Sequence, residues 1–286
     1  MASGEQFFLC GAFALHSSLA PTRTSWRFNM AIKSHRARRS FSGVQIAVFA
    51  KAPLPGFAKS RLIPALGATG AAHLQRAFIR GTVATAIAAN LGPLTLWCTP
   101  DTEHHLFRAL RHHYGIQILI QADGDLGAKM TDAFARHCAT GPLLLIGTDC
   151  PALSPAHLRL AGEALLRGND AVFIPSEDGG YALVGLHEPQ PALFDGIPWS
   201  TSDVLRATLE RAASLGLRAE LLDMLWDVDV PSDLARLERL SEVKASSSER
   251  GHWSNWHRRV RRAAASSESV RSTTAAQTES AAEDYT

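Results

Sequence analysis

Residues 44–50 read VQIAVFA, and the loop after them, residues 51–62, reads KAPLPGFAKSRL. The first run is apolar and contains β-branched residues, which is typical of a strand buried on both faces of a sheet. The second run holds two prolines and a glycine, so it predicts a stiff loop rather than a helix. Together they predict a buried strand that ends in a rigid basic loop.

Apolar strands and helices alternate along the chain after this opening. The predicted strands are residues 94–98, 116–120, 142–147 and 171–174, and the predicted helices are residues 69–91, 102–113, 126–138 and 155–166. Ser154 followed by Pro155 is typical of a helix start, with serine as the N-cap. Such alternation predicts an α/β fold, a Rossmann-like and mostly parallel sheet with helices on both faces.

The pattern changes after Gly180. Residues 181–186 follow the strand at 171–174 too closely for a crossover helix, so we expect them to be antiparallel or to lie outside the main sheet. Helices near residues 202–215 and 231–240 then close the domain.

The two ends of the chain differ from its middle. Residues 1–43 and 241–286 are rich in Ser, Arg, Ala and Glu, and such segments bury too little apolar surface to offset their ordering entropy. We therefore expect a flexible N-terminal extension, a domain over residues 44–240 and a disordered C-terminal tail. The apolar stretch at residues 7–15 departs from a secretory signal because Glu5 stands where that signal has positive charge, and a start at Met30 would remove it.

Composition excludes several classes of protein. The 286 residues are 46% hydrophobic with a net charge of only +2, which does not favour nucleic-acid binding. No run of about eighteen apolar residues predicts an integral membrane segment. The four cysteines show no CxxC pairing, so reduced thiols and a cytoplasmic location are expected.

The loop at 51–62 is the first candidate site. It presents Lys51, Lys59 and Arg61, and the free backbone N–H groups around Pro55 and Gly56 add donors that suit a polyphosphate. A P-loop is excluded because that motif requires Gly directly before Lys-Ser. A solvated basic loop is the alternative.

The sequence GTDCP at residues 147–151 directly follows the strand at 142–147. A carboxylate such as that of Asp149, at the tip of a buried strand, is costly unless something pairs with it. A divalent cation that bridges diphosphate oxygens would do so, because Mg²⁺ is bound by one or two carboxylates plus phosphates. Asp149 could equally cap the following turn.

The sequence PSEDGGY at residues 175–181 carries two acids followed by two glycines. Gly179 and Gly180 allow a tight turn at which the backbone can approach a ligand closely. Asp178 or Glu177 could act as general base toward an acceptor hydroxyl. An ordinary solvated hairpin turn explains the same residues.

Two further segments follow predicted strands or precede helices. In DVDVPSD, residues 227–233, Asp229 could bring a second carboxylate to the metal, although Asp229 or Ser232 could instead cap the next helix. In QADGDLGAKM, residues 121–130, the candidates are Gly124, Asp125 and Gly127. The helix that begins there could receive an anion or a base edge at its N-terminus.

Taken in their order along the chain, these segments resemble the motifs of the DUF2064 glycosyltransferase family. Its opening signature is similar to FAKAP, PG and KSRL within residues 49–62, and its later motifs are similar to GDLG, GTDCP, EDGGY and DVDVP. The resemblance covers residues 44–240. It implies the GT-A-like fold of nucleotide-diphospho-sugar transferases, and some members of the family are associated with arsenosugar biosynthesis.

The resemblance also implies roles for individual residues. The first loop would bind nucleotide phosphates, Asp149 a Mg²⁺ or Mn²⁺ ion, and Asp229 a second metal position. Three positions depart from the expected pattern. Ser60 and Lys129 stand where Thr and Arg are common, and Gly147 replaces the first acid of a plain Asp-x-Asp.

Three functions follow as hypotheses. The leading one is metal-assisted transfer of a sugar from a nucleotide-diphosphate sugar to a small-molecule acceptor. The alternative is nucleotidyl transfer, in which a phosphorylated small molecule attacks an NTP, as in guanylyltransferases of the same fold. The third is a non-catalytic nucleotide-binding module. The two transfers need the same phosphate cradle but release different products.

Overall fold

The structure of this protein is a computed structural model that describes residues 43–246. The predicted N-terminal extension, the signal-peptide alternative and most of the predicted C-terminal tail lie outside these residues. Within the described range, no helix combines the length and the apolar character needed to cross a bilayer.

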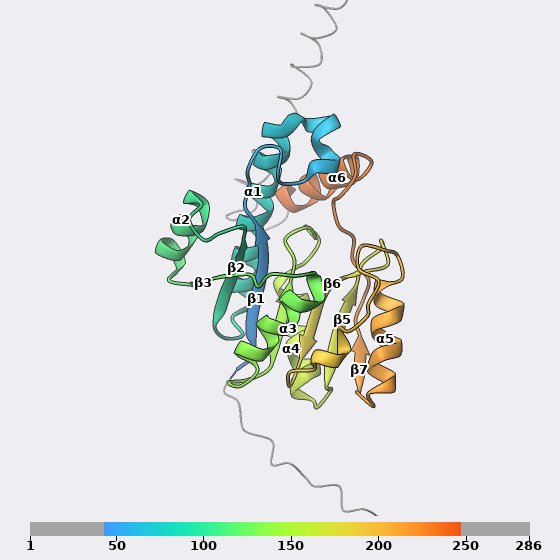
Figure 1. The fold of residues 1–286 in the computed structure, drawn as a ribbon. Helices are drawn as coiled ribbons and strands as arrows, with labels where there is room; N and C mark the ends of the chain where they lie inside the picture. Colours follow the sequence, from blue (N-terminus) through green and yellow to red (C-terminus); the bar gives the residue numbers. More distant parts are fainter. Residues whose placement is uncertain (1–42, 247–286) are drawn as a thin grey trace, which may run out of the picture. The chain divides into compact units, whose positions relative to one another are not determined.

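One sheet of seven strands forms the centre of the described region, in the order β3-β2-β1-β4-β6-β5-β7 (Figure 1). The strands are β1 Gln45–Lys51, β2 Leu94–Thr99, β3 Gln117–Ile120, β4 Leu143–Ile146, β5 Ala171–Pro175, β6 Tyr181–Leu186 and β7 Ala219–Leu221. Strand β1 pairs in parallel with β2 and β4, β2 with β3, and β5 with β7. The predicted mostly parallel α/β sheet is confirmed.

Strand β6 is antiparallel to both β4 and β5 and lies between them in the sheet. Of the two predicted placements, the antiparallel one is therefore right and a position outside the main sheet is wrong. Strand β7 was not predicted, because three residues are too short to show an alternating pattern.

Helices cover both faces of this sheet, as predicted. They are α1 Ile63–Ala89, α2 His105–Tyr114, α3 Leu126–His137, α4 Pro155–Leu166, α5 Val204–Ser214 and α6 Asp233–Ser246, with short 3₁₀ helices η1 Ser60–Leu62 and η2 Pro191–Leu193. Helix α1 begins earlier than predicted, but Gly67 interrupts it with a φ of 68° and a ψ of 165°. Ser154 caps α4 as expected, and its side chain accepts a hydrogen bond from the backbone N–H of His157.

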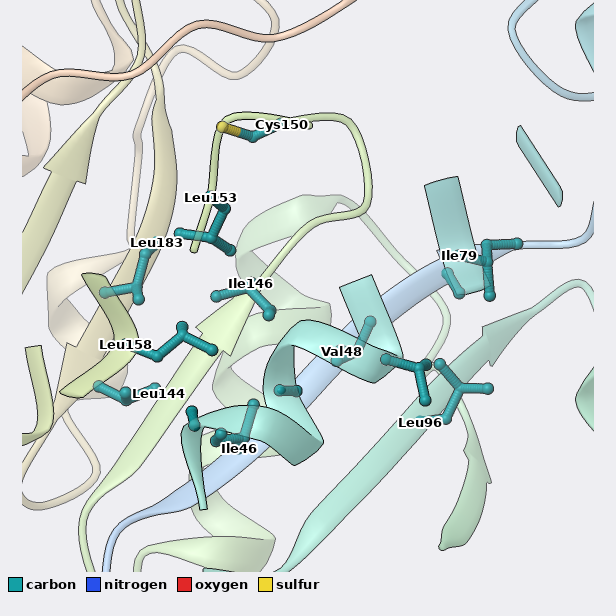
Figure 2. Packing of buried hydrophobic residues seen from close by; sticks show 14 of the residues in the cluster. Ile46, Val48, Ile79, Leu96, Leu144, Ile146, Cys150, Leu153, Leu158 and Leu183 are labelled. Atoms are coloured by element: carbon teal, nitrogen blue, oxygen red, sulfur yellow. The ribbon is translucent and has the colours of Figure 1, made fainter. Parts of the chain in front are cut away.

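Two apolar cores lie on opposite faces of the sheet because successive strand residues point to opposite sides. In β1, Ile46 and Val48 belong to the core that packs with α1, α2 and α4, whereas Ala47 belongs to the core with α3 and α5. Figure 2 shows Ile46, Val48, Leu144 and Ile146 in the first of these cores, which also includes Ile79 of α1. Strands that are apolar on both faces are thus explained by burial on both.

A third apolar cluster lies apart from these cores. It joins Leu62 of η1 and Phe78 of α1 with Trp226, Val228 and, in α6, Leu237. All five side chains are at most 9% exposed. Their packing brings the basic loop next to a segment that is far from it in the sequence, and this cluster supports the candidate site.

Candidate functional site

The side chains of Lys59, Asp149 and Asp229 meet in one ion cluster. The ammonium nitrogen of Lys59 lies 2.9 Å from a carboxylate oxygen of Asp149 and 2.9 Å from one of Asp229. It also donates a hydrogen bond of 2.6 Å to the backbone carbonyl of Val228. The basic loop and the acidic strand tip therefore contact each other directly, although 170 residues separate Lys59 from Asp229.

Lys59 is held in this position by its backbone and by apolar packing. Its φ of 50° lies in the left-handed region, directly before η1, and its ammonium lies 5.6 Å from the centre of the Phe78 ring. The side chain is only 5% exposed. Burial lowers the pKa of Lys59, but the charges and hydrogen bonds of Asp149 and Asp229 outweigh burial, so its pKa is raised overall. Lys59 therefore stays charged at neutral pH.

A buried amide of α1 orients the strand tip that bears Asp149. The side-chain nitrogen of Gln75 donates a hydrogen bond of 3.1 Å to the hydroxyl of Thr148 and one of 3.3 Å to the carbonyl of Lys51. The Thr148 hydroxyl in turn donates 3.2 Å to Asp149. Gln75 thus connects the ends of β1 and β4, and its signal in the sequence was a single amide within an apolar helix pattern.

Residues 225–229 cross the carboxyl ends of the strands. The backbone N–H of Leu225 donates to the carbonyl of Pro175 at the end of β5, and that of Val228 donates to the carbonyl of Asp149 after β4. Figure 1 shows this segment, in orange, running from the β5–β7 edge of the sheet to α6. Asp233 then accepts hydrogen bonds of 2.9 Å from the N–H groups of Asp229 and Val230. Asp233 thus fixes the backbone just before α6, and the Asp229 carboxylate is bound by Lys59.

Asp227, on the same segment, was not among the predicted site residues. It accepts a hydrogen bond of 3.1 Å from the hydroxyl of Ser176. Burial raises the pKa of the Asp227 carboxyl, and the negative charges of Asp178 and Asp229 raise it further. Its signal in the sequence was the alternation of acids in DVDVP, from which only Asp229 was selected.

Several of these residues line a cleft of about 470 Å³. Its acidic side carries the carboxylates Asp149, Asp178, Asp227 and Asp229. The guanidinium of Arg61 also lines it, 69% exposed and 3.7 Å from an oxygen of Asp229. The cleft thus combines a dense group of acids with a mobile cation, because a long exposed side chain keeps its rotamer freedom.

The rest of the cleft lining is largely aromatic and hydroxylic. It is lined by Tyr181 of β6, Trp199 and the turn of Ser200, Thr201 and Ser202. Ser200 has a φ of 66°, an uncommon conformation for a residue other than glycine. The sequence reasoning missed this turn because no strand precedes it, although its WSTS run is an aromatic residue among hydroxyls.

The remaining residues of the basic loop lie elsewhere. Lys51, Pro55 and Gly56 are exposed and do not line the cleft. The ammonium of Lys51 lies 4.1 Å from the centre of the Phe57 ring, which is a cation–π contact. Of the predicted phosphate-binding side chains, Arg61 is the one that reaches the cleft.

The segment before α3 contributes through its helix start. Asp125 is the N-cap, and its carboxylate accepts 2.8 Å from the N–H of Ala128. Leu126 lines the cleft, while Gly124 and Gly127 do not. A Cβ on Gly127 would lie 3.0 Å from the ring of Trp199. Gly127 therefore permits close packing of α3 against the aromatic wall.

The turn after β5 separates its two acids and its two glycines. Both terminal guanidinium nitrogens of Arg236 donate to Glu177, which lowers the pKa of Glu177. Glu177 does not line the cleft. Asp178 and Gly180 line it. Gly179 instead packs against the turn of residues 200–202, where a Cβ would lie 2.1 Å from the carbonyl oxygen of Ser202.

The arrangement does not form a ready metal site. Among the residues the structure describes, no three His, Cys, Asp or Glu side chains are grouped so as to hold an ion. The two acids expected to bind metal, Asp149 and Asp229, share the ammonium of Lys59 instead. A divalent ion, which in the case of Mg²⁺ lies about 2.0–2.1 Å from its oxygen ligands, would have to share these two carboxylates with the ammonium. The free cluster is thus already neutralised in part.

A protein of Desulfovibrio desulfuricans G20 that is assigned as a nucleotide-diphospho-sugar transferase has a similar structure. It is 27% identical, the match covers 79% of this chain and 97% of the other, and the TM-score is 0.67. The 4-diphosphocytidyl-2C-methyl-D-erythritol synthase of Anaerococcus prevotii DSM 20548 is 11% identical, with 70% and 98% covered and a TM-score of 0.48. CMP-2-keto-3-deoxy-manno-octonic acid synthetase, solved with CTP, is also 11% identical, with 71% and 100% covered and a TM-score of 0.46. Because the last two TM-scores lie below 0.5, we draw nothing further from them.

The fold is therefore the Rossmann-like, GT-A type of the nucleotide-diphospho-sugar transferases, with its cleft beyond the carboxyl ends of the parallel strands. Residues 82–201 match the family DUF2064, described as "Uncharacterized protein conserved in bacteria". The resemblance seen in the sequence is confirmed over these residues. No curated protein matched the chain.

Proposed function

We propose that this protein is a glycosyltransferase that moves a sugar from a nucleotide-diphosphate sugar to a small-molecule acceptor. The observation that carries the proposal is the convergence of segments far apart in the sequence on one cleft at the carboxyl ends of β1, β4 and β5. In open α/β sheets this is the position of the ligand. The Desulfovibrio protein, which has this fold, is assigned as a nucleotide-diphospho-sugar transferase.

The charged and the aromatic parts of the cleft lining suit the two parts of such a reaction. A leaving diphosphate develops negative charge, and the exposed guanidinium of Arg61 can turn toward it as a bidentate donor. The aromatic face of Trp199 and the hydroxyls of residues 200–202 offer apolar and hydrogen-bonding surface to a sugar or an acceptor ring. A volume of about 470 Å³ lies in the range of small-molecule sites.

Asp178 is the general base we propose. It lines the cleft, and a hydrogen bond of 2.9 Å from the N–H of Gly180 fixes one of its oxygens. It would accept the proton of the acceptor hydroxyl as that oxygen attacks the sugar and the nucleoside diphosphate leaves. Glu177, the other candidate from the sequence, is engaged by Arg236 and serves to anchor α6 to the turn.

A metal ion that accompanies the diphosphate would supply charge neutralisation to the leaving group. Asp149 and Asp229 are the carboxylates we propose for its contacts. In the structure both carboxylates are bound to Lys59. The roles proposed for Arg61 and Asp178 therefore do not depend on a metal ion.

The proposal is tested first by ligand binding. Thermal unfolding of the purified full chain is measured with a panel of NDP-sugars and NTPs, each with and without Mg²⁺ or Mn²⁺. Ligands that bind the native state raise the unfolding temperature, because they add about 2.7 kcal/mol to the free energy of unfolding at a hundredfold excess over Kd. Stabilisation by an NDP-sugar supports the proposal, and no stabilisation by any member of the panel contradicts it.

Turnover then separates the alternatives. Release of free nucleoside diphosphate from an NDP-sugar supports glycosyl transfer, whereas release of pyrophosphate from an NTP would mean nucleotidyl transfer. Asp178→Asn, which keeps the size of the side chain, should abolish most of the turnover. If a nucleotide binds but Asp178→Asn and Asp149→Ala leave the turnover unchanged, the turnover does not depend on the cleft. The cleft would then only bind nucleotide, and our site assignment would be wrong.

A further inference from the structure

The cluster of Lys59, Asp149 and Asp229 carries one inference beyond the proposed function. A single ammonium contacts one oxygen of each carboxylate at 2.9 Å and the carbonyl of Val228 at 2.6 Å. All three donor positions of the Lys59 ammonium are therefore used within the protein. Lys59 has no donor left for a phosphate while this arrangement persists.

Lys59 also cannot leave the cluster without losing buried contacts. Its side chain is 5% exposed, its ammonium faces the ring of Phe78, and its backbone is fixed in a left-handed conformation before η1. Withdrawal would leave the Asp149 and Asp229 carboxylates without the cation that lies 2.9 Å from each of them, and like charges that share a site disfavour each other. The ammonium is thus part of the folded architecture rather than a surface charge.

We propose that Lys59 is a built-in cation that occupies the position between Asp149 and Asp229 and prevents these carboxylates from binding a divalent metal ion in the free protein. The carboxylates remain 47% and 40% exposed toward the cleft, so their access to solvent is not what limits metal binding. What limits it is the positive charge already placed between them. The inference rests on the proposed function, which assigns Asp149 and Asp229 as metal ligands. Its test, however, needs no nucleotide.

The experiment is a titration of the metal-free full chain with Mn²⁺ alone, with free Mn²⁺ measured by electron paramagnetic resonance. We expect no saturable site in the native protein. Lys59→Met removes the charge and keeps an unbranched side chain, and it should create one site with an affinity at least about tenfold higher, because two unpaired carboxylates then share the vacated position. Mn²⁺ should also raise the unfolding temperature of Lys59→Met but not that of the native protein.

Arg61→Met is the matched control. It removes one positive charge near the same carboxylate, but the Arg61 side chain is 69% exposed and lies 3.7 Å from Asp229. It should bind Mn²⁺ as weakly as the native protein does. An equal gain in Arg61→Met would mean that net charge, not the position of Lys59, controls the metal, and would overturn the inference.

The native protein supplies an independent criterion. Saturable binding of one Mn²⁺ by the native chain, or a folded Lys59→Met that binds no better, overturns the inference. If Lys59→Met does not fold, native protein is compared with Asp149→Asn. Equal and weak Mn²⁺ binding supports the inference, and loss of binding in Asp149→Asn contradicts it. Failure here leaves the NDP-sugar screen untouched, and failure of that screen leaves this titration valid.

Discussion

Substitution of Gly179 by alanine tests how the two walls of the cleft are joined. Gly179 has a φ of 88°, and a Cβ at this position would lie 2.1 Å from the carbonyl oxygen of Ser202 and 2.6 Å from its carbonyl carbon. The atoms it would meet are backbone, so no side-chain rotation relieves the overlap. The carbonyl of Gly179 also accepts a hydrogen bond of 2.8 Å from the N–H of Leu205, which ties the turn to the start of α5.

The expected cost has two parts. A left-handed backbone costs a residue with a Cβ about 1–2 kcal/mol. Forcing extra volume into a packed contact costs about 1–3 kcal/mol. We therefore expect Gly179→Ala to destabilise the protein by about 3 kcal/mol, which lowers the unfolding temperature by roughly 6–12 °C for a domain of this size.

Gly180→Ala is the matched control, one residue away. Its Cβ would lie 3.2 Å from a carboxylate oxygen of Asp178, so it would meet the end of a side chain at a longer distance rather than backbone. Its cost should stay below about 1 kcal/mol. Thermal unfolding and urea titration measure both variants. Equal unfolding temperatures for Gly179→Ala and the native protein would refute the close contact between the turn and Ser202.

Three further predictions use other parts of the cleft and the core. Burial raises the pKa values of Cys98 and Cys138 to about 12, so both thiols stay protonated at pH 7–9. Mass spectrometry should therefore show very slow alkylation of both cysteines at pH 8, and fast labelling of the native chain would contradict their burial. Glu177→Gln should keep turnover near the native level, whereas Asp178→Asn should lower it by a factor of about 10² or more, and the reverse order in steady-state assays would exchange their roles. Trp199→Ala should raise KM by about three- to tenfold through loss of ring contact, while an unchanged KM would exclude the aromatic wall as a binding surface.

The elements of the fold were largely readable from local patterns. The run VQIAVFA and the later apolar runs are strands because burial on both faces requires apolar residues at every position. Helix α1 ends at Ala89, two residues before the predicted end, because Asn90 adopts a left-handed conformation as its C-cap. What local patterns could not supply was the position of β6 between β4 and β5, because that choice depends on pairing partners rather than on the strand itself.

The candidate site was readable as a set of segments but not as a set of contacts. Ligand sites lie beyond the carboxyl ends of parallel strands, so loops after the strands were expected to converge. The partners of individual side chains were not predictable, because they depend on rotamers and on packing between distant elements. Glu177 and Asp178 are neighbours in the chain, yet one pairs with Arg236 of α6 and the other lines the cleft.

The sequence by itself determined the fold class, the order of most elements and the edge of the sheet at which the candidate site lies, because hydrophobic periodicity and loop residues act locally. Tertiary structure alone decided what Lys59 does. Its ammonium was expected to face a phosphate, and it instead lies between Asp149 and Asp229 because the cluster around Phe78 and Val228 buries it there. A buried charge pairs with the opposite charges that packing brings close to it. The distance between Lys59 and the two carboxylates depends on that packing, so no local sequence pattern predicts it.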